Sequence, residues 1–299
     1  MTAIAAKAII VNELNELLLQ LRDQRGSTLY PGKWDLFGGG SLQFESAEET
    51  LRRELKEELG IEVFESTLAF KSERSWDGIL NHVFLVKIPK NAVLSFLGEG
   101  QEKRWVLPKS LVELNTGPLI YRNLFEIGMA IGGLHSKVFE EFEKSLIKKM
   151  RLRKKSGRVY FAEDREAVFS MQDFWQLAAV VQNRGEEIFR VCLHSDQSED
   201  IQEMIICHLR RQVVGPLSQS TGTSISFTPL EGEGVVRLYS PGKDCREVKL
   251  TATDDGVRAL RVRACQARSI ESTITPFIFH EVNKGPFHDS DTDWLEVAL

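Results

Sequence analysis

Apolar residues in the first third of the chain gather into short runs of strand length, separated by polar and glycine-containing turns. Ala5–Val11 and Leu17–Arg22 predict two strands around a turn at Asn12 and Glu13. The further strands that we expect in this part are Trp34–Phe37, Glu62–Arg74, His82–Ile88 and Trp105–Val106.

A different spacing begins after Gly40, where apolar residues recur about once per helical turn. Ser46 followed by Glu49 has the spacing of a capping box, and Gly60 is the residue type expected just past a helix end. The pattern therefore predicts a helix that starts near Ala47, with an apolar stripe formed by Ala47, Leu51, Leu55 and Leu59.

Two further helical stretches, Pro108–Leu114 and Leu119–Ile131, follow the last of these strands. Strands and helices in this order predict an α/β fold in which helices flank a mixed sheet. Ser136–Lys155 is predicted to be a connecting helix that ends in a basic cluster. We expect a first domain at 1–135, a helical linker at 136–155 and a second domain at 156–299.

The second part of the chain has a different pattern. After a predicted helix at Asp173–Asn183, short apolar runs alternate with closely spaced turns, which is typical of a β-sandwich or barrel. The strands expected are Ile188–His194, Glu203–Arg210, Ser224–Leu230, Val235–Tyr239, Glu247–Ala252, Ala259–Cys265 and Thr275–Glu281.

Composition narrows the classes of partner. The 299 residues are 42% hydrophobic and 27% charged, which is typical of globular domains. The net charge of -5 gives no electrostatic reason to expect a nucleic-acid polymer. We find no signal-peptide pattern and no apolar run of membrane-spanning length, so no membrane partner is expected. The four cysteines form no CxxC pair, which favours reduced thiols and a cytoplasmic location.

Three carboxylates crowd one face of the predicted helix. Glu54, Glu57 and Glu58 are spaced i, i+3 and i+4, which is unfavourable in an isolated helix. A hard divalent cation would reverse that balance, because it prefers carboxylate oxygens as ligands. The glycines from Gly38 to Gly40 would let the backbone approach a metal or a ligand closely.

The stretch from Gly39 to Ile61 resembles a complete Nudix box, with Gly39, Glu45 and the run from Arg53 to Ile61 at the defining positions. The resemblance covers roughly residues 3–135 and implies an α/β/α sandwich. It implies a Mg2+- or Mn2+-dependent hydrolase in which water attacks the phosphorus of a diphosphate linkage. The implied substrate is a small nucleoside diphosphate derivative, either a sugar nucleotide or a modified nucleoside triphosphate.

The resemblance also implies roles for individual residues. Arg53 would hold the glutamates by ion pairing, and Glu45 would have a similar orienting role. Glu99 precedes Gly100 and Gln101 ahead of a Trp strand, as in the mutator-type Nudix enzymes, so it would be a metal ligand or the general base, with Glu102 as a substitute. The base stays open between the box glutamates and Glu99. The metal ligands implied are Gly39, Glu54, Glu57, Glu58 and Glu99.

Specificity should come from residues outside the box. Six side chains on strands or loops near the expected cleft are candidates for substrate contact, although a core role is equally open for the two phenylalanines. These candidates are Arg22, Trp34, Asp35, Phe37, Arg74 and Phe84.

The second part resembles small cupin-fold proteins associated with polysaccharide biosynthesis, through runs such as Arg190–His194, Leu230–Gly232 and Phe279–Val282. It departs from the cupin pattern where a metal would bind. The positions of the cupin ligands fall on Ser218, Ser220, Ile225 and the neighbourhood of Arg268. Hydroxyl and aliphatic side chains do not replace imidazoles for a transition metal, so a metal-free domain is expected, used for binding, packing or homodimer formation.

Two other readings compete with the hydrolase. A non-catalytic sensor of nucleotides or sugar nucleotides would tend to lose box glutamates, and this chain keeps all of them. An isomerase acting on a prenyl diphosphate would need a cysteine in the first domain, whereas the first cysteine is Cys192. The sequence therefore favours an active Nudix-type pyrophosphohydrolase.

Overall fold

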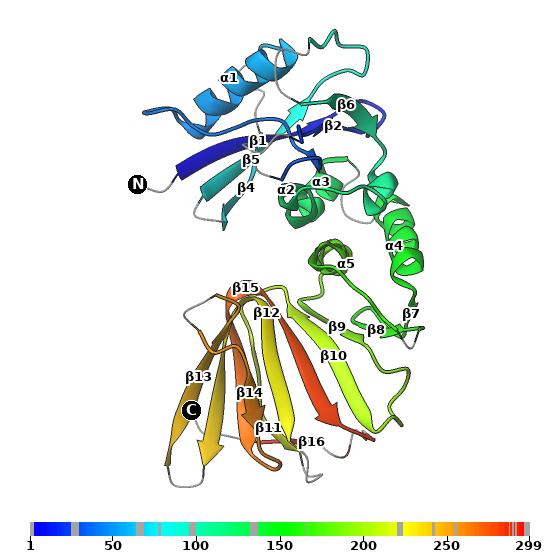
Figure 1. Ribbon diagram of the computed structural model, residues 1–299, viewed down its shortest axis with the longest axis vertical. Coiled ribbons are helices and arrows are strands. Elements are labelled where there is room, and N and C mark those ends of the chain that lie inside the picture. Colours follow the sequence, from blue (N-terminus) through cyan, green and yellow to red (C-terminus); the bar gives the residue numbers. More distant parts are fainter. Residues whose placement is uncertain are drawn as a thin grey trace. The chain divides into compact units, whose positions relative to one another are not determined.

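Contacts divide the chain into two units, one formed by Met1–Leu146 with Met171–Asn183 and the other by Ile147–Ser170 with Arg184–Leu299 (Figure 1). The computed structural model describes residues 3–24, 30–63, 69–76, 79–95, 100–131, 137–164, 166–219, 224–240, 243–253, 256–286, 288, 290 and 292–295.

A six-stranded mixed sheet forms the middle layer of the first unit. β1 (Ala3–Val11) pairs in parallel with β5 (Ile79–Lys87) and antiparallel with β2 (Leu17–Leu21). The strand order is β3-β2-β1-β5-β4, with β6 paired to β2. The other three strands are β3 (Trp34–Asp35), β4 (Ala69–Trp76) and β6 (Glu102–Val106).

Helices cover both faces of this sheet, which gives the three-layer sandwich expected from the sequence. Figure 1 shows α1 along one face and α2 and α3 on the other, and α5 packs against α2 and α3. The helices are α1 (Ala47–Leu59), α2 (Pro118–Arg122), α3 (Leu124–Ile131) and α5 (Met171–Asn183).

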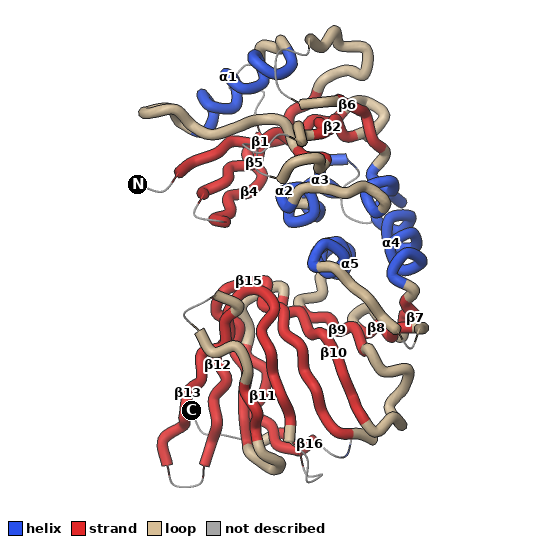
Figure 2. The backbone as a smooth tube through the Cα atoms, viewed as in Figure 1, coloured by secondary structure: helices blue, strands red, loops and turns tan. Residues whose placement is uncertain are grey.

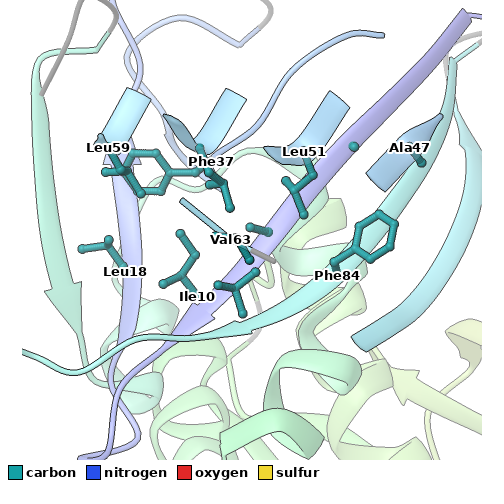
Figure 3. Packing of buried hydrophobic residues seen from close by; sticks show 12 residues of the cluster. Ile10, Leu18, Phe37, Ala47, Leu51, Leu59, Val63 and Phe84 are labelled. Carbon is teal, nitrogen blue, oxygen red and sulfur yellow. The ribbon is translucent and has the colours of Figure 1, made fainter. Parts of the chain in front are cut away.

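The stripe predicted for α1 packs onto the sheet (Figure 3). Leu51 and Leu59 lie in one buried cluster with Ala6, Ala8 and Ile10, which alternate along β1. Burying a leucine side chain of this kind contributes about 1.5–3 kcal/mol. The apolar stripe therefore fixes the rotation of α1 about its axis and decides which way its acidic residues point.

The helices after β6 differ from the prediction in two places. The stretch expected as one helix from Leu119 to Ile131 divides at Asn123, whose buried side chain donates to the carbonyl of Leu119 at 2.8 Å. The backbone N–H of Asn123 donates to the same carbonyl at 3.2 Å, so the end of α2 is held by a backbone and a side-chain hydrogen bond together. Pro108–Val112 forms a short 3-10 helix instead of an α-helix.

The connecting helix α4 (Lys137–Met150) is shorter than expected. Arg151 has a positive φ of 51°, a conformation that ends a right-handed helix. The basic residues that follow lie in part on a short strand, β7 (Leu152–Lys154).

A ten-stranded sheet builds the second unit (Figure 2). Its order is β13-β12-β15-β10-β9-β8-β7, with β11 paired to β15 and β16, and β14 paired to β12. β12 is a single long strand where the sequence predicted two, because irregular pairing around Glu231 and Gly232 carries the strand through the expected break. The remaining strands are β8 (Val159–Ala162), β9 (Ile188–Cys192), β10 (Ile201–His208), β11 (Val213–Gln219), β12 (Ile225–Ser240), β13 (Lys243–Thr251), β14 (Leu260–Val262), β15 (Ala267–Lys284) and β16 (Thr292–Trp294).

The predicted fold class, an α/β sandwich with a mixed sheet followed by a mainly β part, is confirmed. The predicted domain limits stay a prediction. The observed units differ from these limits at α5, which the contacts assign to the first unit. It follows Ser156 in sequence, yet its almost entirely buried side chains pack in the first unit. Within the described residues, no helix is long and apolar enough to cross a membrane.

His208 is a buried titratable residue of the second unit, with an exposed fraction of 1%. Its ring meets Phe277 and Phe279 edge-on, and within the described part of the chain its Nδ1 has no hydrogen-bond partner. Burial lowers the pKa of His208 to about 4. The folded protein therefore keeps this imidazole neutral at pH values where an unfolded chain binds a proton.

The variant His208→Phe tests this pKa shift. Because the unfolded state takes up the proton first, the wild type should lose about 3 kcal/mol of unfolding free energy relative to the variant as the pH falls from about 6.5 to 4. Urea denaturation of both proteins at a series of pH values measures the difference. Parallel stability curves would show that His208 titrates normally in the folded protein.

Candidate active site

The helix α1 begins and ends as its sequence predicts. The Ser46 hydroxyl accepts from the Glu49 backbone N–H, and the Glu49 carboxylate accepts from the Ser46 backbone N–H. Gly60 ends the helix in the left-handed conformation, with φ of 68°. Both ends are therefore held by local hydrogen bonds, and the residues between them have a fixed helical position.

Arg53 connects the carboxylates of the site. Its Nε and Nη2 donate to Glu45 at 2.9 and 3.1 Å, and its Nη1 donates to Glu54 at 2.6 Å and to Glu57 at 3.1 Å. Nη2 also donates to the carbonyl of Gly40 at 3.0 Å. One guanidinium thus ties together the helix, the glycine turn and the loop before the helix, which is the pairing role expected for Arg53.

Glu45 is held on the loop before the helix. The hydrogen bonds from Arg53 are the largest cause that lowers the pKa of Glu45 to about 2, followed by the bond from the Leu42 backbone N–H at 2.9 Å. The Thr50 hydroxyl also donates to it at 3.2 Å. Glu45 is consequently a permanent anion whose contacts go to protein groups, as expected for an orienting residue.

Glu58 lies in a different environment from Glu57. Its carboxylate accepts from the Gly38 backbone N–H at 2.8 Å and from the Gln20 amide at 3.2 Å. Burial raises the pKa of Glu58, against the charge of the nearby Lys7, which lowers it. By contrast, 59% of the Glu57 side chain is exposed to solvent.

Lys7 and Gln20 are site residues that the sequence analysis missed. Lys7 donates to the carbonyl of Gly38, and the Gln20 amide donates to the carbonyl of Leu36 at 3.1 Å as well as to Glu58. Each is a buried polar residue within an otherwise apolar strand. Such residues need a partner, so their position in an apolar run was a usable signal.

Gly39 gives the Glu54 carboxylate room beside the backbone. A Cβ atom at position 39 would lie 2.6 Å from the carboxylate atoms of Glu54, which is closer than carbon and oxygen atoms can pack. The carbonyl of Gly39 accepts from the Ala6 backbone N–H at 2.9 Å and retains a second lone pair. The absence of a side chain at Gly39 therefore brings a carboxylate and a backbone carbonyl together.

The oxygen atoms gathered around Glu54 and Gly39, called the cradle below, are ligand types that suit a hard divalent cation. Carboxylate oxygens of Glu54, Glu57 and Glu58 and the Gly39 carbonyl are the ligand types that Mg2+ and Mn2+ prefer. Within the described residues, no group of three or more acidic, His or Cys side chains is close enough to form a ready metal cluster. Nη1 of Arg53, which bonds both Glu54 and Glu57, stands between two of the expected ligands. Their role as metal ligands stays a prediction.

Glu99 and Glu102 were the loop carboxylates considered as metal ligand or general base, and the structure describes one of them. Glu99 lies outside the described residues. Glu102 lies on β6, where its carboxylate accepts from Arg104 at 2.6 Å.

Four of the six residues expected to contact the substrate are buried. Phe37 and Phe84 are almost completely buried in the core cluster below α1, so the core alternative holds for both rings (Figure 3). Asp35 is also buried, and its carboxylate pairs with Arg22 at 3.5 Å. Trp34 is buried too, with the Arg104 guanidinium 4.8 Å from its ring centroid.

Arg74 lies on β4, at the register position opposite Asn81 of β5. Its side chain lies outside the described part of the structure. Among the candidates whose side chains are described, Arg22 carries a charge that is 18% exposed. Substrate contact by any of the six stays a prediction.

The comparisons with known proteins agree with this geometry. Residues 1–126 match the family model of the NUDIX domain. The chain belongs to the Nudix family, and it is a pyrophosphohydrolase of the Nudix type.

One relative is the nucleoside triphosphatase NudI of Escherichia coli O139:H28, which is 30% identical over 116 residues, covering 35% of this chain and 81% of NudI. The crystal structure of a MutT protein from Methanosarcina mazei Go1 is 31% identical, covers 42% of this chain and 90% of that one, and has a TM-score of 0.36. The structure of QdtA, a sugar 3,4-ketoisomerase from Thermoanaerobacterium thermosaccharolyticum, is 14% identical, covers 30% of this chain and 64% of that one, and has a TM-score of 0.27.

Gly39→Ala tests the cradle around Glu54. The added Cβ must displace the carboxylate of a flexible side chain, so the fold should survive while nucleotide hydrolysis falls by about tenfold or more. Initial rates with a panel of nucleoside triphosphates measure the loss.

Gly40→Ala is the matched control, because a Cβ at position 40 meets no atom within 4 Å and the carbonyl that accepts from Arg53 is kept. Equal rates for the two variants would show that close approach at Gly39 is not required.

Proposed function

We propose that the chain hydrolyses the diphosphate linkage of a small nucleoside diphosphate derivative, either a modified nucleoside triphosphate or a sugar nucleotide, in a Mg2+- or Mn2+-dependent reaction. The observation that carries this proposal is the set of bonds from Arg53 to three glutamates beside Gly39, since it collects negative oxygens on one side of α1. The relative NudI, by its name a nucleoside triphosphatase, supports a nucleotide substrate.

In this proposal Glu54, Glu57 and Glu58 hold the ion together with the carbonyl of Gly39. The ion supplies charge neutralisation at the diphosphate and a lower pKa for the attacking water. Arg53 bonds Glu54 and Glu57 at the same time and so keeps these two carboxylates from moving apart.

The backbone N–H of Gly38 and the amide of Gln20 orient Glu58, so that one carboxylate of the set is fixed from within the sheet. The exposed Glu57 faces the solvent from which water and substrate arrive. The general base is one of the box glutamates or Glu99, and Glu102 is the substitute for Glu99.

We further infer that the second unit is a metal-free, cupin-like barrel. The positions that would carry imidazole or carboxylate ligands hold Ser218 on β11, the buried Ile225 on β12 and Arg268 on β15. Metal analysis of the purified chain tests this part, and a tightly bound transition metal would contradict it. The buried Cys192 and Cys207 suit the cytoplasmic location that we propose for the protein.

Glu57→Gln tests the catalytic part. The amide has the shape of the carboxylate but lacks its charge, so the rate of hydrolysis should fall by about 100-fold or more with little change in thermal stability. Release of phosphate, diphosphate or nucleoside monophosphate from a nucleotide panel in the presence of Mg2+ is the measurement.

Glu48→Gln provides the comparison, because Glu48 is a half-buried glutamate in the first turn of the same helix and is not one of the proposed ligands. Full activity in Glu57→Gln would refute the assigned metal site. No hydrolysis of any nucleotide by the wild type, together with tight nucleotide binding, would favour the sensor reading instead.

A further inference from the structure

A cavity of about 750 Å³ lies within the second unit. Residues of β8, β9, β10, β11, β12 and β15 line it. Its volume falls in the range of about 300–1,000 Å³ that is usual for sites of small organic ligands. The Nudix chemistry of the first unit makes no use of this cavity.

Cross-strand register shows which side chains face the cavity. Ile206 of β10 lies opposite Arg190 of β9 and Phe279 of β15, and in the next row Met204 lies opposite Glu281. Directly opposed residues of neighbouring strands point to the same face of a sheet. All five line the cavity, so one charged residue of each sign stands on an otherwise apolar wall.

The two ends of β15 meet at one polar group in this wall. The Gln219 side-chain oxygen accepts from Arg268, near the start of β15, at 3.2 Å and from Asn283, near its end, at 3.1 Å. Arg268 is 7% exposed, and its guanidinium lies 6.0 Å from the centroid of the Phe227 ring. A buried guanidinium is thus positioned by an amide and an aromatic ring; among the described residues no salt bridge to it is found, and the charge of Glu281 acts on it through space.

Positive charge predominates around the cavity. Among the described lining residues, Glu281 is the one carboxylate, whereas Lys155, Arg158, Arg190 and Arg268 carry positive charges. Arg158 is paired with Glu186 at 3.5 Å, which leaves three cations facing one carboxylate. Burial raises the pKa of Glu281, while the charges of Arg268 and Arg190 lower it.

We propose that this cavity binds a small organic anion. Arg268 and Arg190 hold its carboxylate or phosphate group, and its ring or apolar body packs against Phe227 and Phe279. A purely apolar ligand would leave Glu281 as the one carboxylate facing Arg190 and Arg268 among the described lining residues, whereas an anion adds a second negative charge beside the desolvated guanidinium.

Three naphthalene compounds of similar shape distinguish the contribution of ligand charge to the affinity from the contribution of apolar packing. Titration calorimetry of the full chain with 1-naphthoate, 1-naphthyl phosphate and the uncharged 1-naphthalenemethanol should show at least one anion binding about tenfold or more tighter than the alcohol. The tighter of the two anions then identifies carboxylate or phosphate as the preferred group. Equal binding of all three, or binding of none, would overturn the proposal.

Variants of the lining residues locate the binding. Arg190→Gln changes an exposed side chain, so the fold should be kept while the affinity of the tighter anion falls about tenfold or more. Arg268→Met should have a larger effect, with its thermal unfolding recorded alongside because that residue is buried. Glu281→Gln should tighten the anion several-fold, which loss of a structural contact would not do.

Arg211→Gln is the matched control, since Arg211 is an exposed arginine of the same unit that does not line the cavity. Loss of affinity equal to that of Arg190→Gln, or unchanged affinity in Arg190→Gln, would remove the cavity as the site. Glu57→Gln should leave anion binding unchanged, so failure of the hydrolase proposal and failure of this one give different results.

Discussion

Repulsion among the carboxylates of α1 is the constraint on which the first unit depends. Glu54, Glu57 and Glu58 lie within a span of five residues on one helix, and such crowding of like charges opposes helix formation. Arg53 offsets it within the helix, and the N–H of Gly38 and the nearby Lys7 offset it from the sheet. The acidic side can therefore form only where the helix, the glycine turn and β1 already meet.

That arrangement explains which parts of the site could be predicted. The capping box at Ser46, the stop at Gly60 and the leucine stripe are local patterns, so they specify where α1 begins, ends and faces. Local chemistry was sufficient for these features because each involves neighbours within about two turns of helix or one loop. The pairing role of Arg53 was expected through the resemblance to the Nudix box, and its bonds to Glu45 appear in the structure.

Features that depend on distant partners were not predicted. Lys7 and Gln20 enter the site from strands far from α1 in sequence, and their role appears only once those strands pair. Phe37 was a candidate for substrate contact because aromatic residues stack on bases, but β1 and α1 enclose its ring completely. The division of a helix at Asn123 likewise depends on burial of one amide, which no periodicity of apolar residues reveals.

The second unit shows the same contrast on a larger scale. Its mainly β character was evident from alternation and turns, although two predicted strands form the single strand β12. The meeting of Arg268, Gln219 and Asn283 requires both ends of β15 to converge. Buried polar groups of this kind limit what a strand can pack against, since each needs a partner within the wall. The polar part of the cavity thus depends on the folded sheet as a whole and on no single segment.

The path of the chain between the units has a consequence for how the protein can be divided. After Leu146 the chain enters the second unit, it returns to the first to form α5, and it leaves again after Asn183. Each unit is therefore built from two separate segments of the chain, and cleavage of a single peptide bond does not separate the two units. A fragment that stops before α5 lacks the helix that packs against α2 and α3, so the first unit is complete only in a chain that continues through Asn183.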